Sequence, residues 1–484
     1  MISQRFNECQ KKALNSANKL REGDILLIEA LPGSGKMKML IGLLSLFMLN
    51  ENPKILICSY SSEAIGKILE KLNRKKLYDE NLNHMKLNFF RHNGIINIWF
   101  NNSTLYKIKD NFTENQKKDF EIFKKDIKLN VRTKISKKLM KIDFKHLFEM
   151  FMENKKEKDE GCSELFLKET PIMLADFENI SKSFIKKYNY DYLIIYDACR
   201  STELDCLLPL CLNTKYMILI GDRNQIKSKV YSSFSKRIKY NRSLFERLIE
   251  GGKKPIILDF RSKIPDIINN YLNKNYYDNK IRNDKEKIIK LNNNSIYEII
   301  KSDKCLYFFD LVNCYQLRNT QDNIDYFNIF EMDLIIEILN KLVIEKKYTY
   351  TIITPYKIQT KKLEKLKKIN DLKNNENMNI EVKLLDTCDG DISDIVFFST
   401  VRTEFKNQND IKIFEDFRYL NFVLSKAKFA CFILGNSETL EACKIWKDFI
   451  NYCREIKCYI KIKEKFTPGF FDLSEYIKNV VNLK

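Results

Sequence analysis

Glycine, proline and histidine are all scarce in this chain of 484 residues, which contains 13, 8 and 3 of them respectively. Average usage is about 7% Gly and 5% Pro, so collagen-like and Pro/Gly-rich low-complexity architectures are excluded. Hydrophobic residues make up 44% of the chain, which supplies enough apolar material for folded cores and excludes wholesale disorder. At this length we expect two or three domains.

The 13 cysteines follow neither the spacing of a metal site nor that of a disulfide framework. No CxxC pair occurs, and three histidines are too few to complete a structural zinc cluster. The start of the chain lacks a signal peptide, and the longest apolar stretch, roughly 39–49, is too short to span a bilayer. We therefore expect a protein without membrane association, in a reducing intracellular setting, nuclear or cytoplasmic.

Lysine and arginine outnumber aspartate and glutamate by 84 to 64, which gives a net charge of +20. Such an excess suits a polyanionic partner such as nucleic acid. A general enrichment of lysine along the chain would give the same number. The charge alone therefore does not identify a partner.

One pair of glycines lies between a strand-like and a helix-like segment. The apolar run "DILLIEA" (24–30) precedes "LPGSGK", and "MLIGLLSLFML" follows shortly after it. Backbone N–H groups of such a loop, the N-terminus of the helix and Lys36 would form a cradle for phosphate. Measured against GxxxxGK[ST], Ala30 replaces the first glycine and Met37 replaces the hydroxyl residue. A chance surface turn is the alternative, but both flanking patterns favour a phosphate loop.

Apolar strands alternate with helix-length segments along most of the chain, which is typical of doubly wound parallel sheets. Asp197 lies at the end of one such strand, where open parallel sheets bind their ligands. We therefore predict an α/β fold with two tandem domains whose cleft closes on a nucleotide. Strands are expected within 24–30, 54–62, 190–200 and 216–225 in the first domain, and within 350–357, 382–390, 394–402 and 429–436 in the second.

Residues 95–165 are rich in lysine and interrupt the alternation of strands and helices. Apolar residues at helical spacing predict a helical insertion with an apolar seam. Its charges suit a solvated face, and a specific nucleic-acid surface is the alternative. The expected domain limits are 1–94 and 166–250 for the first domain, 95–165 for the insertion and 251–484 for the second domain. The seam consists of Phe120, Phe123, Ile127, Val131, Ile135, Leu139 and Ile142.

A series of motifs extends from about residue 6 to about residue 462. "FNECQ", "LPGSGKM", "CSYSSEAIGKIL", "LIIYDACRSTEL" and "ILIGDRNQI" are followed by "ITPYKIQ", "LLDTCDGDISDIVFFSTVR" and "DFRYLNFVLSKAKFACFILGN". In content and order this series resembles superfamily-1 helicases of the senataxin and up-frameshift type. Which of the two branches is closer stays open. The family's N-terminal barrel would precede "FNECQ", so we expect it to be missing.

The resemblance implies two RecA-like P-loop NTPase domains that bind ATP and single-stranded RNA or DNA. Gln10 stands at the family's adenine-reading glutamine, and Asp197, Gln225 and Lys426 stand at catalytic positions. The other nucleotide-binding positions are Gly33, Ser34, Gly35, Lys36, Met37, Gly390 and either Arg261 or Lys263, depending on the alignment of "FRSKIPD"; the nucleic-acid-binding positions are Ser61, Thr354, Pro355 and Thr387.

Several departures from the family pattern affect the groups that cut ATP. Hydrolysis needs Mg²⁺ held by the loop hydroxyl and a strand-end aspartate, and a carboxylate that positions water. Met37 offers only a thioether, a poor ligand for a hard cation. Aligned without gaps, Tyr196 stands at the metal aspartate and Asp197 at the water-positioning glutamate. A shift by one residue makes Asp197 the metal ligand but leaves Ala198 at the glutamate, so one carboxylate is missing in either register.

Further substitutions concern charge around the phosphates. Lys426 replaces the family's arginine finger, which contributes roughly 10³–10⁵ in rate, and it lacks the bidentate guanidinium fork. Arg200 and Asp389 each replace a motif glutamine. We therefore predict a pseudo-helicase that binds RNA or DNA, binds ATP weakly and holds Mg²⁺ poorly, with no dedicated metal site. An active ATP-dependent 5′–3′ helicase with unusual metal ligation and a protein-interaction scaffold are the alternatives.

Overall fold

The computed structural model describes residues 6–100, 171–283 and 305–462. Short internal gaps fall at 51–52, 76, 79–83, 86, 93–94, 181–187, 229, 231, 262–263, 313, 320–324, 343–347, 367–368, 370–377, 389–391 and 407. The chain divides into two compact units. The first unit comprises 1–31, 35–223 and 227–258, and the second comprises 32–34, 224–226 and 259–484.

The first unit is built on a sheet whose strands follow the order β10-β1-β9-β8-β2-β7-β6-β5. The six strands from β10 to β7 are parallel, while β6 and β5 continue the sheet in antiparallel fashion. Parallel neighbours that are far apart in sequence need helical crossovers, as the alternating pattern predicted. The strands are β1 (Ile25–Ala30), β2 (Ile55–Ser59), β5 (Leu87–His92), β6 (Ile95–Phe100), β7 (Ile172–Asp176), β8 (Tyr190–Tyr196), β9 (Thr214–Gly221) and β10 (Ile256–Leu258).

The strand that precedes the glycine loop lies inside this sheet. β1 pairs with β9 on one side, where Ile28 lies opposite Ile220, and with β10 on the other side. Ile28 and Ile220 are fully buried, as expected for a parallel strand covered on both faces. The loop after β1 and the ends of β8 and β9 therefore meet at the same carboxyl edge of the sheet.

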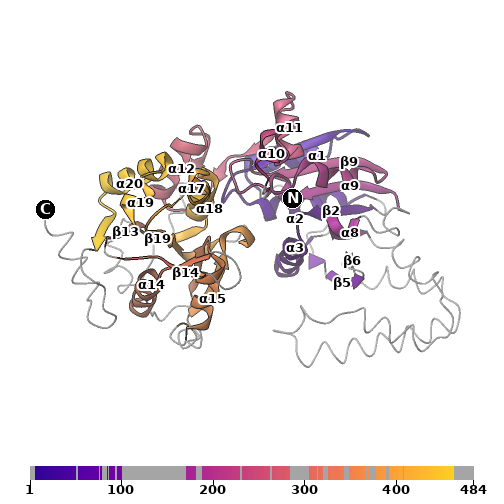
Figure 1. Ribbon diagram of the computed structural model, residues 1–484. Coiled ribbons are helices and arrows are strands. Elements are labelled where there is room, and N and C mark those ends of the chain that lie inside the picture. Colours follow the sequence, from indigo (N-terminus) through magenta and orange to yellow (C-terminus); the bar gives the residue numbers. More distant parts are fainter. Residues whose placement is uncertain are drawn as a thin grey trace, which may run out of the picture. The chain divides into compact units, whose positions relative to one another are not determined.

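Helices cover the sheet of the first unit (Figure 1). They include the crossover helices α2 and α3 and the pair α9 and α11, which follow β8 and β9. Side-chain capping boxes begin α1, α9 and α11, so these starts are fixed by local sequence. The bounds are α1 (Glu8–Ala17), α2 (Lys36–Phe47), α3 (Ser62–Lys75), α8 (Phe177–Ile180), α9 (Glu203–Leu210), α10 (Ser233–Arg237) and α11 (Leu244–Glu250).

The predicted insertion at 95–165 coincides only in part with described residues. Residues 95–100 form strand β6, which pairs with β5 and β7 in the first sheet. The rest of the predicted insertion, including its apolar seam, lies outside the described residues. Its helical character stays a prediction.

The second unit contains a six-stranded, all-parallel sheet in the order β17-β16-β18-β19-β13-β20. Its core gathers aliphatic and aromatic side chains such as Ile352, Phe397 and Phe432, all at most 1% exposed. The strands are β13 (Leu306–Leu311), β16 (Tyr348–Thr354), β17 (Met378–Leu384), β18 (Ser393–Ser399), β19 (Ala427–Gly435) and β20 (Tyr459–Ile462).

Helices of the second unit include α12 (Asp266–Tyr276), α14 (Ile329–Lys341), α15 (Lys357–Lys365), α18 (Phe417–Leu424) and α20 (Lys444–Glu455). The predicted α/β class and the two tandem parallel sheets are thus confirmed, and each of the eight predicted strands overlaps an observed one, although the predicted 382–390 shares only its first three residues with β17. Strands β5, β6, β7, β10, β13 and β20 of the two sheets were not predicted, and β6 occupies the start of the expected helical insertion.

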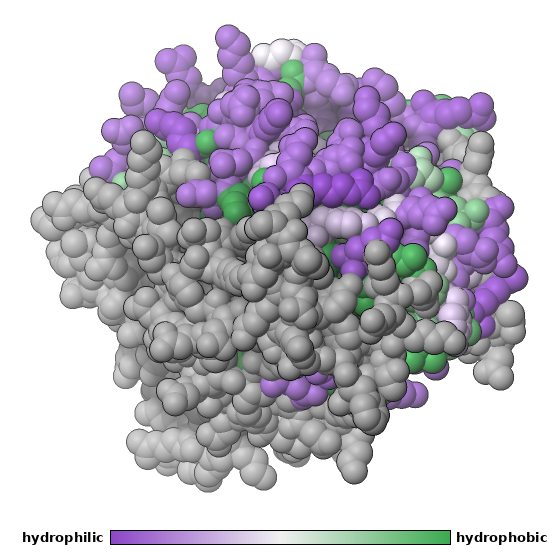
Figure 2. Space-filling view, turned by 90° about the vertical axis from the view of Figure 1, so that its left-hand side faces the viewer, coloured by the Kyte–Doolittle hydropathy of each residue, from purple (hydrophilic) through white to green (hydrophobic). Residues whose placement is uncertain are grey.

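On the face shown in Figure 2, the residues coloured by hydropathy are mainly hydrophilic, and the hydrophobic ones are scattered in small groups. In the described parts of the chain, no helix is both long enough and apolar enough to cross a bilayer. The described cysteines are all free thiols, and most of them are buried, where they pack as small hydrophobes.

Candidate nucleotide-binding site

The loop between β1 and α2 has the backbone geometry of a phosphate cradle. Gly33 and Gly35 have φ values of 76° and 90°, in the left-handed region that side chains other than glycine rarely adopt. Gly35 is the N-cap of α2 and offers no side chain to its first turn. The N–H groups at this helix start therefore have no side-chain cap, which suits them to an anion.

Gln10 lies beside this loop. Asn7 and Gln10 form a capping box at the start of α1, in which the Gln10 side-chain oxygen accepts from the Asn7 backbone N–H at 3.3 Å. The Gln10 amide nitrogen is 2.9 Å from the point where a Cβ on Gly35 would lie. A side chain at position 35 would therefore displace the Gln10 amide, in addition to the strain that the left-handed φ of Gly35 imposes on any other residue.

Asp197 faces the phosphate loop. It follows the last residue of β8 with a φ of 56°, and its carboxylate forms an ion pair with the Lys36 ammonium at 2.5 Å. The preceding Tyr196 belongs to the strand, and its ring centroid is 5.9 Å from Lys36 Nζ. The fold therefore brings the Asp197 carboxylate to the loop.

Lys36 is held in its charged form. Burial lowers its pKa, but the attraction and hydrogen bond of Asp197 and the attraction of Asp222 outweigh burial, so the pKa is raised overall. Asp222, just after β9, is 2% exposed. The Lys36 charge is thus compensated by carboxylates, and a phosphate group would compete with Asp197 for it.

The residues of the loop fit phosphate but not the family's Mg²⁺ site. Met37 is in the first turn of α2 and only 8% exposed, with a thioether where a hydroxyl ligand would be needed. Asp197 is engaged by Lys36. Within the described residues, no cluster of three or more His, Cys, Asp or Glu side chains could hold a metal ion.

Arg200 and Ser61 occupy motif positions at the neighbouring strand ends. The Arg200 guanidinium lies 4.4 Å from the centroid of the Tyr60 ring, a cation–π contact. Burial raises the pKa of Tyr60 to about 12, so this ring stays neutral. Ser61 Oγ accepts the Ala64 N–H at 3.1 Å at the start of α3. Ser61 therefore has a capping role in addition to the contact implied by the resemblance.

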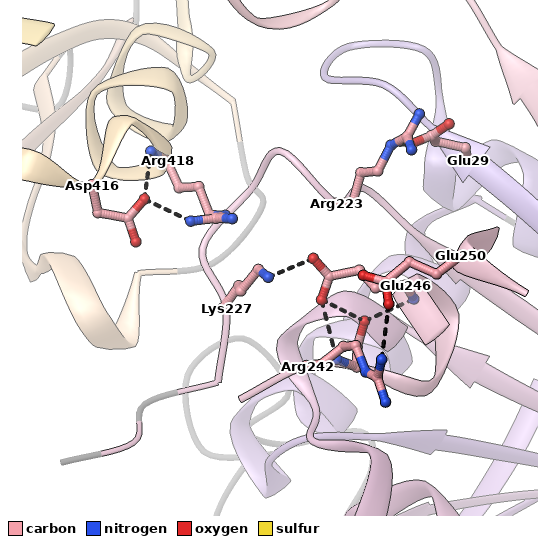
Figure 3. Close-up of polar contacts among 9 residues, drawn as sticks. Glu29, Arg223, Lys227, Arg242, Glu246, Glu250, Asp416 and Arg418 are labelled. Carbon is pink, nitrogen blue, oxygen red and sulfur yellow. Dashed lines mark hydrogen bonds and ion pairs between the residues drawn. The ribbon is translucent and has the colours of Figure 1, made fainter. Parts of the chain in front are cut away.

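Two acidic residues near this edge of the sheet were not predicted. Glu29, 2% exposed on β1, forms an ion pair with Arg223 at 2.8 Å (Figure 3). Asp176, at the end of β7, is hydrogen bonded to Ser62 and, at 2.8 Å, to the Asn179 N–H. A glutamate inside the apolar run "DILLIEA" was a usable signal, because a charge inside a buried strand requires a partner.

In the second unit, Gln225 donates to the Tyr277 hydroxyl at 3.4 Å. Lys426, at the start of β19, is 6% exposed, and its ammonium lies 4.1 Å from the centroid of the Phe422 ring. Arg261 is in the short strand β11 (Phe260–Arg261), and its side chain is not described.

The remaining predicted positions are also in this unit. Thr354, fully buried at the end of β16, accepts the Tyr356 N–H at 3.4 Å, and Pro355 follows it. Thr387 ends a 3-10 turn and donates to the Leu384 carbonyl at 3.3 Å. Lys263, Gly390 and Asp389 lie outside the described residues.

A buried polar cluster in the second unit was also not predicted. Glu331 on α14 accepts hydrogen bonds from Ser399 Oγ at 2.5 Å and from the Val401 N–H at 2.9 Å. Gln359 donates to Ser399 at 2.9 Å, and Val401 has a φ of 70°. Burial raises the pKa of Glu331 to about 8, against the hydrogen bonds, which lower it. The cluster fixes the turn after β18.

Comparison with known families covers both units. Two family models described as AAA domains match the chain, one at residues 5–94 and 101–233 and the other at residues 240–438. Members of such families bind ATP. The matched ranges include the glycine loop, Asp197 and Lys426.

Among curated relatives, Helicase SEN1 of Saccharomyces cerevisiae is 22% identical over 94% of this chain and 23% of its own length. ATP-dependent helicase upf1 of Schizosaccharomyces pombe is 25% identical over 56% of this chain and 29% of its own length. The uncharacterized ATP-dependent helicase MJ0104 of Methanocaldococcus jannaschii is 24% identical over 93% of this chain and 71% of its own. The chain thus spans less than a third of the two yeast proteins.

Among solved structures, the PRRSV helicase aligns over 90% of this chain and 56% of its own, with a TM-score of 0.37 and 9% identity. The family models, the curated relatives and the two parallel sheets agree with one another. The chain belongs to the superfamily-1 helicases of the Sen1 and Upf1 type.

Proposed function

We propose that this chain is a helicase-fold protein that binds single-stranded RNA or DNA and binds ATP weakly, with hydrolysis slow or lost. The observation that carries the proposal is the state of the phosphate loop. Its backbone cradle and Lys36 are intact, whereas the residue that should offer a hydroxyl to Mg²⁺ is the buried Met37. A nucleotide can be held by such a loop, but its metal cannot be held in the family's way.

The missing second carboxylate supports the same conclusion. Asp197 is followed by Ala198, which is fully buried, so the next residue in the motif offers no carboxylate for the water-positioning role. Asp197 itself is bound to Lys36. With one acid in place of two, either metal ligation or activation of the attacking water is weakened.

Lys426 adds a third deficit. The family's arginine would spread its charge over two N–H donors, but a lysine ammonium acts as a point charge. Loss of an arginine finger lowers phosphoryl-transfer rates by roughly 10³–10⁵. Together with Met37, this supports binding without efficient turnover.

Single-stranded nucleic acid is the partner that best explains the charge of +20 in a chain of this family. Such binding is dominated by phosphate contacts and weakens steeply with salt. Ser61, Thr354, Pro355 and Thr387 are the positions at which the family contacts the strand, and we propose that they do so here. Titration with both RNA and DNA oligonucleotides would show which of the two is preferred.

Two assays on the purified chain test the proposal. Phosphate release should be at most slightly above background, with or without single-stranded RNA or DNA, and Lys36→Ala should not lower it further. Fluorescence anisotropy with labelled oligonucleotides should show micromolar or tighter binding that weakens from roughly 50 to 200 mM salt. Absence of oligonucleotide binding at low salt would refute the proposal.

An active ATPase is the second candidate, favoured by one observation. The Asp197 carboxylate does lie at the phosphate loop, and Asp222 is close enough to influence the pKa of Lys36. These two carboxylates could hold Mg²⁺ in place of the hydroxyl ligand that Met37 does not offer. Turnover that nucleic acid stimulates, and that Lys36→Ala abolishes, would establish this alternative.

A further inference from the structure

The segment that follows β9 is unusually basic. Between residues 223 and 254 the sequence holds ten Lys and Arg residues against two Glu, a net of eight positive charges in a chain whose total is +20. No Asp or Glu occurs from 223 to 245. Such a local excess is the electrostatic signature of a site for a polyanion.

Part of this charge is neutralised inside the first unit. Lys227 pairs with Glu246 at 2.5 Å, and Arg242 pairs with Glu250 at 2.8 Å (Figure 3). Arg247 pairs with Glu203 at 2.5 Å. These acids are therefore already engaged by cations that anchor the segment.

The cations on α10 and just after it are exposed to solvent. Lys236, Arg237 and Lys239 are exposed and, among the described residues, have no ion pair with a carboxylate. They alternate with exposed apolar side chains: Phe234 is 60% exposed and Tyr240 43%. We define the α10 basic–aromatic surface as Phe234, Lys236, Arg237, Ile238, Lys239 and Tyr240.

Backbone hydrogen bonds hold this surface in a fixed conformation. Ser232 caps α10, and Lys239 takes the left-handed conformation at φ 60°. The Tyr240 N–H then donates to the Ser235 carbonyl at 2.9 Å, the six-to-one bond of a Schellman turn. Arg237 lies over the Phe234 ring at 5.9 Å. The rings and cations are thus presented in a fixed order.

We propose that the α10 basic–aromatic surface is a second binding site for single-stranded nucleic acid, outside the motif positions discussed above. Cations interleaved with exposed rings are what a single strand requires, because phosphates pair with the cations and bases stack on the rings. A partner helix would instead need a continuous apolar stripe. Here Lys236, Arg237 and Lys239 interrupt the apolar side chains. The site extends the proposed function and depends on it.

The charge test uses two matched double variants. Lys236→Glu/Lys239→Glu reverses two exposed lysines three residues apart on the proposed surface. Lys444→Glu/Lys447→Glu reverses two exposed lysines of the same spacing on α20. Anisotropy with oligonucleotides of about 20 nucleotides should show affinity lowered about tenfold or more by the first variant, with the salt slope reduced by about 1.4, and little change from the second.

The stacking test uses Phe234→Ala/Tyr240→Ala, with Leu204→Ala/Leu207→Ala on α9 as the control, since these leucines are also exposed. The aromatic variant should weaken oligonucleotide binding about tenfold without changing the salt slope. Ultraviolet cross-linking of the wild-type complex should recover a peptide that carries Tyr240. Circular dichroism should show all four variants folded, because every replaced side chain is exposed.

The outcomes separate this proposal from the proposed function. If the wild-type chain binds no oligonucleotide, the proposed function fails and this site with it. If the wild-type chain binds oligonucleotide and neither α10 variant differs from its control, the second site is refuted and the proposed function is unaffected. Loss in the charge variant alone, with no cross-link at Tyr240, refutes stacking and hence a single-strand site.

Discussion

Replacement of Glu331 by glutamine should change how stability depends on pH. Glu331 is fully buried, and burial raises its pKa from an ordinary value of 4.5 to about 8. In the unfolded chain the carboxyl loses its proton above about 4.5, while in the folded protein it keeps the proton up to about 8. Between these values the folded state binds more protons, so stability falls as pH rises.

The magnitude follows from the two pKa values. One pKa unit corresponds to 1.36 kcal/mol, so a displacement from 4.5 to about 8 corresponds to about 5 kcal/mol of stability lost between these pH values. Glu331→Gln removes this loss. The glutamine amide keeps an acceptor for the Val401 N–H, and any lost hydrogen bond would cost about 1–3 kcal/mol at every pH. Only the slope of the unfolding free energy against pH distinguishes the removal of the titrating carboxyl from the loss of a hydrogen bond.

The few histidines and tryptophans of the sequence simplify this assay. The three histidines are at 84, 92 and 146, so the second unit has no histidine that titrates in this range. The only tryptophans are Trp99 and Trp446, and Trp446 packs in the core of the second unit. In a Trp99→Phe background, urea unfolding followed by Trp446 fluorescence at several pH values from about 5.5 to 8.5 would report on this unit.

The wild-type protein should lose stability steadily over this range, while Glu331→Gln should give a nearly flat profile. Parallel profiles for the two proteins would refute the reasoning. A flat profile for the wild type would show that Glu331 is already ionised in the folded state over this range, with the hydrogen bonds from Ser399 and Val401 stronger than the effect of burial.

Two further predictions concern the first unit and its catalytic set. Met37→Thr combined with Lys426→Arg should raise ATP turnover at least tenfold in a phosphate-release assay, because a metal hydroxyl and a finger arginine are restored; no increase would show that the missing carboxylate alone prevents hydrolysis. Gly221→Ala should destabilise the protein by about 1–3 kcal/mol in thermal unfolding, because the new Cβ would lie 2.6 Å from Cys199 Sγ; Cys199→Ala should restore part of the loss, and an unchanged midpoint would contradict the packing at Gly221.

Most of the fold was predicted from the order of the motifs along the chain. Apolar runs such as "DILLIEA" and "YDYLIIYDACR" encode buried parallel strands by composition alone, since both faces of such a strand are covered. Short strands at the sheet margins, such as β10 and β20, were not predicted because three or four residues carry too little pattern. β7 was missed although "PIMLAD" is apolar, because it follows the lysine-rich stretch.

The candidate site was predicted in type but not in arrangement. The sequence placed Lys36 in a glycine loop and Asp197 at a strand end, but it could not say whether the Asp197 side chain points at the loop or away from it. In the structure Asp197 has a left-handed backbone, and its carboxylate pairs with Lys36. Side-chain direction at a strand end depends on one backbone dihedral, which local pattern does not fix.

The sequence by itself therefore determined the family, the two sheets and the identities of the altered catalytic groups, because these are properties of residue order and type. Tertiary structure decided which partners the buried acids meet. Glu29 pairs with Arg223, and Glu331 accepts hydrogen bonds from Ser399 and Val401. These partners come from distant parts of the chain. Burying a charge is costly without a partner, so the sequence can reveal that a partner is needed, but only the packed fold selects it.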